Sequence, residues 1–453
     1  MYKPRVMLLC CGESVYPCEW LYEYYTEIRH GLTELDIELA GAHLVIDEHA
    51  IVPIREELKN TEFDVIVVHF VSWHISGYVT SIIKDYKHIP ILAWATGGRT
   101  RNGKLHSPAS AAGITAFLPV LKEMGFKYKA IYEKPDEPHR FKDVEQYART
   151  ARAYAKVKNS RVGLVGYADM GLYTCSYDKT AVFTKLGIDV EDYFSYEIGE
   201  RMSKVSDEEI QDIAAGIKSK FRFENEVSRQ ALDKIARLYS VLKSKVEERG
   251  LDAISIKCVQ GVTKYMGVNP CMAQSLLAGR DLSVICECDA YGLITNMMMS
   301  MLTSQTAAFM ENYEFFDNEI LVGTCGFLPL DFADGELKAR SANLGDFFIG
   351  MSNVSKARTG VVTFARLFKE NDCFRMFAAR GEAKDPPKWI ELGWEEPTPD
   401  FPSLLIKLEM SAQRYMETVP GQHIIISYGD CLEQLKDLCA MMDIEVVTYT
   451  GEH

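Results

Sequence analysis

The chain has 453 residues and a formal net charge of −14, with 47% apolar and 25% charged residues. This length exceeds what one hydrophobic core usually serves, so two or three globular domains are expected, and the composition excludes a disordered chain. The acidic balance argues against nucleic acid and anionic membranes as partners, because binding to either depends on clustered Lys and Arg.

The start of the chain and the cysteines favour a cytoplasmic location. The first residues, Met1–Leu9, carry too short an apolar run for a signal peptide, and no stretch approaches the ~20 apolar residues of a membrane span. Twelve cysteines are scattered without a pair of CxxC motifs, which is typical of free thiols in a reducing compartment.

The first third of the chain alternates apolar runs with helical stretches, which predicts a doubly wound α/β domain over residues 1–158. The predicted strands are rich in Val, Ile and Leu, as buried parallel strands are: Val6–Cys10, Val65–Val68 and Ile89–Ala95. Helices are expected near Tyr78–Tyr86 and over the polar segment Asp143–Lys158, which closes the domain.

A second α/β domain is predicted over residues 159–305. Its strands are Arg161–Val165, Ala253–Lys257 and Leu282–Glu287, and helical spacing of apolar residues marks Ser206–Lys220 and Ser228–Arg249. A further helix, about Tyr291–Ala308, contains a run of methionines that we interpret as core filling. The glycines of Gly163–Gly171 do not match the GxGxxG spacing, which disfavours a nicotinamide dinucleotide site.

Residues 306–453 are predicted to form a β-rich domain that contains a small barrel. Separate strands with turns between them are expected at Ile320–Gly323, Gly360–Phe368 and Cys373–Ala379. The end of the chain is predicted as strand, helix and strand over Ile424–Ser427, Asp430–Met442 and Ile444–Thr448. The predicted fold class is therefore two doubly wound α/β domains followed by a β-rich, barrel-containing C-terminal domain.

Polar side chains follow predicted strands at the edge where open α/β sheets bind ligands. Gln260 follows the strand Ala253–Lys257, and Glu287 ends the next one, so both are expected to face one crevice. The long helix after Glu287 can return the chain to a neighbouring strand end and so bring Glu311 close to it. The alternative is that Glu311 is one solvated acid of an exposed acidic patch.

A histidine at the start of an apolar strand is the third candidate. His423 precedes Ile424-Ile425-Ile426, where a histidine is either structural or a ligand. Two carboxylates and one imidazole, from Glu287, Glu311 and His423, suit Mn²⁺ or Mg²⁺, which favour oxygen-rich coordination. Zinc is disfavoured because no cysteine cluster is suitably spaced.

Two features of the first domain are candidates for substrate contact. The loop Gly97–Lys104 concentrates Arg99, Arg101 and Lys104 and can hold a sulfonate, phosphate or carboxylate, unless it is a solvated basic loop. Trp73 follows the strand Val65–Val68 and can stack on a sugar face or pack at a subunit contact.

Four segments, in this order, resemble the L-fucose isomerase-like sugar isomerases, distant relatives of the L-arabinose isomerases. They are Phe70–Trp73; Ile256–Gly261 with its Lys-x-x-Gln-Gly pattern; Cys286–Gly292 with the following Phe309–Glu311; and Gly421–His423 with Tyr428–Asp430. The chain departs from the family at Glu311, where the family usually has an aspartate.

The resemblance implies a metal-dependent aldose–ketose isomerase that acts through an enediolate on a hexose, deoxyhexose or pentose. It implies Glu287, Glu311 and His423 as metal ligands, with both glutamates also serving as base and acid, and Mn²⁺ before Mg²⁺ or Co²⁺ as the ion. It further implies that Gln260 orients a substrate hydroxyl and that Trp73 lines the pocket of a neighbouring subunit in a homo-oligomer, often a hexamer.

The basic loop at residues 99–104 leaves room for an anionic sugar such as a sulfohexose. Two alternatives stay open: an epimerase on the same scaffold, and a non-catalytic sugar-binding protein. The third, β-rich domain and the N-terminus without a signal peptide weigh against the latter.

Overall fold

The computed structural model describes residues 3–343, 348–388 and 401–448. The chain divides into two compact units. The first unit comprises residues 1–155 together with 436–443, and the second comprises residues 156–435 together with 444–453. The finer division of the chain at residues 158 and 305 stays a prediction.

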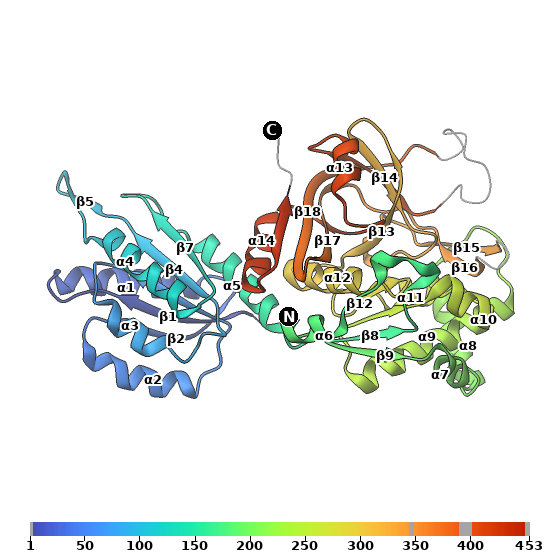
Figure 1. The fold of residues 1–453 in the computed structure, drawn as a ribbon, viewed down its shortest axis with the longest axis horizontal. Coiled ribbons are helices and arrows are strands. Elements are labelled where there is room, and N and C mark those ends of the chain that lie inside the picture. Colours follow the sequence, from blue (N-terminus) through green and yellow to red (C-terminus); the bar gives the residue numbers. More distant parts are fainter. Residues whose placement is uncertain (1–2, 344–347, 389–400, 449–453) are drawn as a thin grey trace. The chain divides into compact units, whose positions relative to one another are not determined.

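Five parallel strands form the sheet of the first unit, in the order β2-β1-β3-β4-β7 (Figure 1). They are β1 (Arg5–Cys11), β2 (Glu38–Val45), β3 (Val65–Phe70), β4 (Ile91–Thr96) and β7 (Tyr128–Glu133). The first strand of the chain, β1, lies inside the sheet, and later strands are added on both sides of it, as in a doubly wound fold. Every residue of β3 and β4 is buried, which confirms the interpretation of their continuous apolar sequence.

Helices connect these strands. They are α1 (Cys18–Thr33), α2 (Ile51–Lys59), α3 (Ser76–Ile83), α4 (Ser110–Met124) and α5 (Phe141–Val157). The basic segment that we predicted as a loop instead forms a hairpin of β5 (Arg99–Arg101) and β6 (Lys104–His106). Asn102 and Gly103 adopt φ values of 52° and 74°, the left-handed geometry that a two-residue hairpin turn requires.

The second unit begins with a parallel sheet in the order β12-β11-β8-β9. Its strands are β8 (Arg161–Val165), β9 (Asp189–Tyr193), β11 (Ala253–Ile256) and β12 (Ser283–Cys286). Its helices are α6 (Lys179–Ala181), α7 (Ser195–Met202), α8 (Asp207–Lys220), α9 (Arg229–Arg249), α10 (Lys264–Met266), α11 (Cys271–Leu277) and α12 (Ala290–Thr303). Ser206 and Ser228 cap α8 and α9, which explains why both helices start where the sequence predicted.

Helix α12 confirms the interpretation of the methionine run, because Met297, Met298 and Met299 are fully buried. The predicted end of this helix at Ala308 was wrong. The helix stops at Thr303, Ser304 turns with a φ of 58°, and Ala308 begins a strand.

A closed six-stranded barrel follows, as the sequence predicted. Its strands are β13 (Ala308–Phe315), β14 (Glu319–Gly323), β17 (Gly360–Glu370), β18 (Cys373–Lys384), β19 (Ser403–Leu408) and β20 (His423–Tyr428). The neighbours run β17-β20-β13-β14-β19-β18, and β18 pairs back onto β17, which closes the ring. The barrel interior is apolar and includes Phe364, Phe377 and Ile426.

Smaller elements complete the chain. A separate sheet is formed by β10 (Arg222–Phe223), β15 (Lys338–Asn343) and β16 (Ile349–Asn353). The remaining elements are α13 (Ala412–Thr418), α14 (Leu432–Met441) and β21 (Glu445–Thr448), and β21 pairs with β18. Over the three described stretches of the chain, no helix is both long enough and apolar enough to cross a membrane.

Candidate active site

Glu287 leaves strand β12 in a strained backbone conformation. The strand ends at Cys286, one residue earlier than predicted, and Glu287 and Cys288 then adopt φ values of 65° and 49°. Residues other than glycine in this region cost on the order of 1–3 kcal/mol each and cluster at functional sites. Asp289 ends the turn by accepting a hydrogen bond from Gly292 N (2.9 Å) at the start of α12. The turn holds the buried Glu287 side chain at the carboxyl end of the sheet.

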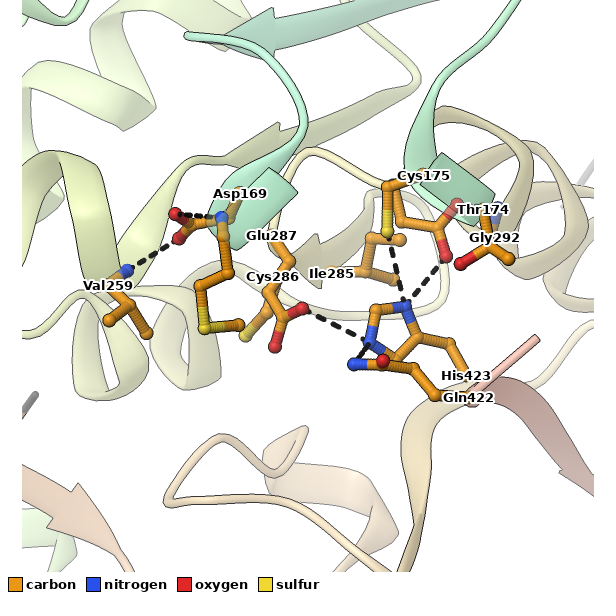
Figure 2. A network of polar contacts seen from close by, with 12 residues as sticks. Asp169, Thr174, Cys175, Val259, Ile285, Cys286, Glu287, Gly292, Gln422 and His423 are labelled. Atoms are coloured by element: carbon orange, nitrogen blue, oxygen red, sulfur yellow. Dashed lines mark hydrogen bonds and ion pairs between the residues drawn. The ribbon is translucent and has the colours of Figure 1, made fainter. Parts of the chain in front are cut away.

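His423 faces Glu287 from the barrel. It is the first residue of β20 and fully buried, and its Nε2 lies 3.2 Å from Glu287 Oε2 (Figure 2). Gln422 Nε2 lies 2.9 Å from the same ring nitrogen. Within the described part of the chain, Glu287 Oε2 is buried and accepts no hydrogen bond. A buried oxygen without a donor, directed at a ring nitrogen, is an arrangement that a cation would complete.

Glu311 lies opposite His423 in the barrel wall. Strands β13 and β20 are antiparallel, and Glu311 is in register with His423. Desolvation and then the charge of Glu287 raise the pKa of the Glu311 carboxyl to about 7. Glu311 is therefore a partly buried acid close enough to Glu287 to feel its charge, rather than a freely solvated one.

These three side chains fit a divalent cation. Glu287 and Glu311 bring two acids together in a desolvated place, which is unfavourable unless a positive charge compensates them. Carboxylate oxygens and an imidazole nitrogen are ligands of Mn²⁺ and Mg²⁺ sites that keep positions open for substrate. Two carboxylates and an imidazole are thus the kinds of donor that such a cation needs.

The other ring nitrogen of His423, Nδ1, contacts side chains on the side away from Glu287. Nδ1 lies 2.8 Å from Asp289 Oδ2 and 3.7 Å from Cys175 Sγ. Each of these three residues offers a ligand atom within 4.8 Å of the others. Asp289, however, already pairs with Arg366 (Nη2 to Oδ1, 3.3 Å) and caps α12, so its carboxylate is occupied. Such a carboxylate can orient the imidazole, as those behind metal-binding histidines do.

The buried charges determine the protonation of this group. Burial alone would raise the pKa of Asp289, but the Arg366 guanidinium and then His423 hold it well below 3.8. Burial also opposes a charged imidazole, yet the neighbouring Asp289, Cys175 and Glu287 raise the pKa of His423 well above 6.5. Asp289 is thus ionised at neutral pH, and Nδ1–H of His423 donates to it.

Gln260 lies at the same sheet edge as Glu287. It belongs to a π-helical turn, Cys258–Thr263, that follows β11 directly, and it is exposed. Strands β11 and β12 are parallel neighbours with Ile256 opposite Cys286. The turn with Gln260 and the turn with Glu287 therefore leave adjacent strands at their carboxyl ends, as predicted.

The predicted substrate contacts of the first domain lie in the first unit. Trp73 follows β3, is 39% exposed, and donates its backbone N–H to Pro108 O (2.9 Å). Arg99 donates to Glu27 Oε2 (2.8 Å) and lies 4.2 Å from the centre of the Tyr24 ring.

Arg101 is arranged in the same way. It donates to Glu23 Oε2 (2.7 Å) and lies 5.0 Å from the centre of the Trp20 ring. The basic hairpin is thus partly compensated by acids of α1, a feature that the sequence pattern did not reveal.

Three members of the site were not predicted from the sequence: Cys175, Asp289 and Arg366. Asp289 carried a signal, because Asp directly before an apolar helical run is a typical N-cap. Arg366 carried another, because an arginine inside the apolar strand β17 requires a buried acid as partner. Cys175 carried none.

The sequence is similar to those of several known sugar isomerases. Residues 325–450 match the family described as "L-fucose isomerase, C-terminal domain". The sulfoquinovose isomerase of Priestia megaterium is 19% identical over 421 residues, 91% of each chain, and that of a Clostridium species is 23% identical over 429 residues, 90% of this chain and 92% of the relative. The L-arabinose isomerase of Bacillus subtilis is 21% identical over 368 residues, 76% of this chain and 71% of the relative. Residues 325–450 therefore match an L-fucose isomerase domain, and over most of its length the chain is similar to sugar isomerases, which are intramolecular oxidoreductases of the aldose–ketose type.

Proposed function

We propose that this chain is a metal-dependent aldose–ketose isomerase that holds a divalent cation with Glu287, Glu311 and His423, Mn²⁺ being favoured over Mg²⁺ or Co²⁺. The observation that carries the proposal is the buried Glu287 Oε2, which lies 3.2 Å from His423 Nε2 and accepts no hydrogen bond within the described residues. Asp289 contacts Nδ1 of the imidazole and leaves Nε2 directed at Glu287.

A bound cation would polarise the substrate carbonyl and the neighbouring hydroxyl. The chain's own groups then move the protons. One carboxylate, Glu287 or Glu311, takes the proton from the carbon beside the carbonyl and returns it to the former carbonyl carbon of the enediolate. A second proton passes between the two oxygens, so the sugar keeps its composition. Gln260, at the same sheet edge, orients a substrate hydroxyl.

The substrate that we propose is an anionic sugar of the sulfohexose type, with neutral hexoses, deoxyhexoses and pentoses as the alternative. Two of the relatives described above are named for sulfoquinovose. Arg99 and Arg101 offer guanidinium groups that form charge-assisted hydrogen bonds with a sulfonate. Each also pairs with an acid, but a guanidinium has five N–H donors and can serve two partners.

We further propose a cytoplasmic homo-oligomer, of which a hexamer is the expected form, in which Trp73 of one subunit lines the pocket of another. Large exposed side chains follow β8 and β9 of the second unit: Tyr167 (73%), Tyr173 (93%), Phe194 (80%) and Tyr196 (79%). Exposed aromatic surface of this kind supports an interface at that sheet edge. The cysteines described in the structure are free thiols, which supports a reducing compartment.

An NMR assay tests the proposed function. Purified protein is incubated with sulfoquinovose, L-fucose or L-arabinose, and the ketose signals are followed with Mn²⁺ and after treatment with a chelator. We expect ketose from sulfoquinovose with Mn²⁺, no turnover after metal removal, and recovery with Mn²⁺ that exceeds recovery with Zn²⁺. Full turnover after verified metal removal would refute the metal site, and no ketose from any of the three sugars would refute these substrates.

A further inference from the structure

The loop after β8 contains a fully buried acid that the mechanism above does not use. Asp169 lies in the glycine-containing segment that failed to match a dinucleotide motif, and its exposure is 0%. A buried carboxylate without hydrogen-bond or charge partners is energetically unfavourable, so the partners of Asp169 indicate its role.

Asp169 forms hydrogen bonds with the backbone of its own turn and of two further turns. Its Oδ2 accepts a hydrogen bond from Val259 N (2.6 Å; Figure 2). Its Oδ1 accepts hydrogen bonds from Gln260 N (3.0 Å) and Met170 N (2.9 Å). Its own backbone N–H donates to Glu287 O (3.1 Å). One residue therefore connects the turn after β11, which carries Gln260, with the strained turn after β12, which carries Glu287.

The charge of Asp169 is balanced by the buried Lys257, and two nearby glycines provide the space for this lysine side chain. Lys257 Nζ lies 3.7 Å from Asp169 Oδ1 and donates to Ala168 O (3.2 Å). A Cβ added at Gly166 or at Gly261 would lie 2.9 Å from the Lys257 side chain, and Gly166 also has a φ of +101°. The glycines of both segments thus allow the loop after β8 and the turn after β11 to close around this ion pair.

We propose that Asp169 is a positioning residue that holds Gln260 and Glu287 in one fixed arrangement at the sheet edge. The inference rests on the proposed function, because it takes Glu287 as a metal ligand and Gln260 as a substrate contact. The carboxylate restrains the turn that carries Gln260 and the loop after β8, and the backbone N–H of that loop at Asp169 holds the turn that carries Glu287, without touching substrate or metal. Misplacement of reacting groups by about 1 Å costs about 10²-fold in rate.

The test compares Asp169→Asn with a matched control, Asp252→Asn. Asp252 also accepts a backbone hydrogen bond, from Arg161 N (2.9 Å), but it precedes β11 at the opposite edge of the same sheet. We expect Asp169→Asn to lower kcat about 10²-fold and to weaken Mn²⁺ binding, measured by electron paramagnetic resonance without substrate, about 10-fold. We expect Asp252→Asn to lower the melting temperature only.

Three outcomes are informative. Suppose that Glu287→Gln abolishes Mn²⁺ binding. Near-normal kcat and Mn²⁺ affinity in Asp169→Asn would then overturn this inference and leave the proposed function intact. Unchanged Mn²⁺ binding in Glu287→Gln would refute the proposed function itself, and with it the inference. If Asp169→Asn does not fold, Lys257→Met decides instead: a smaller fall of kcat and Mn²⁺ affinity supports the role of Asp169, and unchanged values refute it.

Discussion

Both units bury a histidine near the carboxyl edge of a parallel sheet, and the two histidines have opposite surroundings. In the first unit, His74 packs against Phe70 and Phe117 with neither ring nitrogen hydrogen-bonded to a described residue, and burial lowers its pKa to about 4. In the second unit, His423 contacts Asp289 and Glu287, and its pKa is raised. A buried histidine among apolar rings is a packing residue, whereas one among acids is a candidate ligand.

The acids of the two units differ in the same way. In the first unit, Glu23 and Glu27 each find an arginine within the unit. In the second unit, the buried cation Arg366 pairs with Asp289. Glu287 and Glu311 instead lie close enough for their negative charges to repel each other. Charges compensated within the chain stabilise the fold, while crowded charges of one sign indicate that a ligand supplies the balance.

The largest effect is expected for Glu287→Gln, which removes a charge and keeps the shape. We expect turnover to fall at least about 10³-fold, because a metal ligand contributes several kcal/mol to transition-state stabilisation. The fold should be retained, since relief of repulsion with Glu311 offsets the change. The NMR assay and a thermal melt measure both effects.

The matched control is Glu314→Gln, an exposed acid on the same strand as Glu311. It should keep normal turnover. Near-normal turnover in Glu287→Gln as well would show that Glu287 is structural, and the contrast between the units would lose its basis.

The second effect concerns the buried ion pair. Arg366→Met leaves Asp289 charged and unpaired in the interior, so we expect a loss of about 3–5 kcal/mol in the free energy of unfolding. Urea denaturation followed by circular dichroism measures it. Arg380→Met, which breaks surface pairs with Glu409 and Asp430, should cost less than about 1 kcal/mol. Equal costs would mean that Asp289 does not need its partner.

The third effect tests whether the hairpin of the first unit serves substrate or only structure. We expect Arg99→Ala to raise KM for sulfoquinovose roughly 30-fold, because an arginine–anion pair contributes on the order of 2 kcal/mol. KM for a neutral aldose should scarcely change, and added salt should weaken binding of the anionic sugar. Lys122→Ala, an exposed lysine of the same unit, is the control. Equal, small changes for both sugars would assign Arg99 to its pair with Glu27 alone.

The smallest effect is a pH dependence of stability. Burial lowers the pKa of His74 from 6.5 to about 4, so the unfolded chain binds more protons between these values, and stability falls as pH falls. The loss due to His74 is about 1 kcal/mol between pH 7 and pH 5.5.

His74→Leu should flatten this dependence. It should not abolish it, because burial lowers the pKa of His69 in the same direction. Urea midpoints of both proteins at the two pH values provide the measurement. An unchanged slope in the variant would show that His74 becomes protonated without opening the fold.

Local sequence determined most of the individual elements. Continuous apolar runs predicted β3, β4 and β8, because a parallel strand buried on both faces has no polar alternation. Capping serines at 206 and 228 marked the starts of α8 and α9. The placement of Gln260 and Glu287 at one edge followed from the polarity of parallel strands alone.

Only the tertiary structure decided how the site is completed. Glu311 meets His423 because the closing barrel pairs β13 with β20, two segments far apart in the chain, and no local pattern encodes that register. Arg366 and Asp289 are 77 residues apart, and each is tolerated in the interior only because the other is there. The hydrogen bonds of Asp169 have the same origin, since backbone groups carry no sequence signal of their own. Periodicity and capping act within a few residues and so can be read from the sequence, whereas charge pairing and strand register depend on which distant segments the fold brings together.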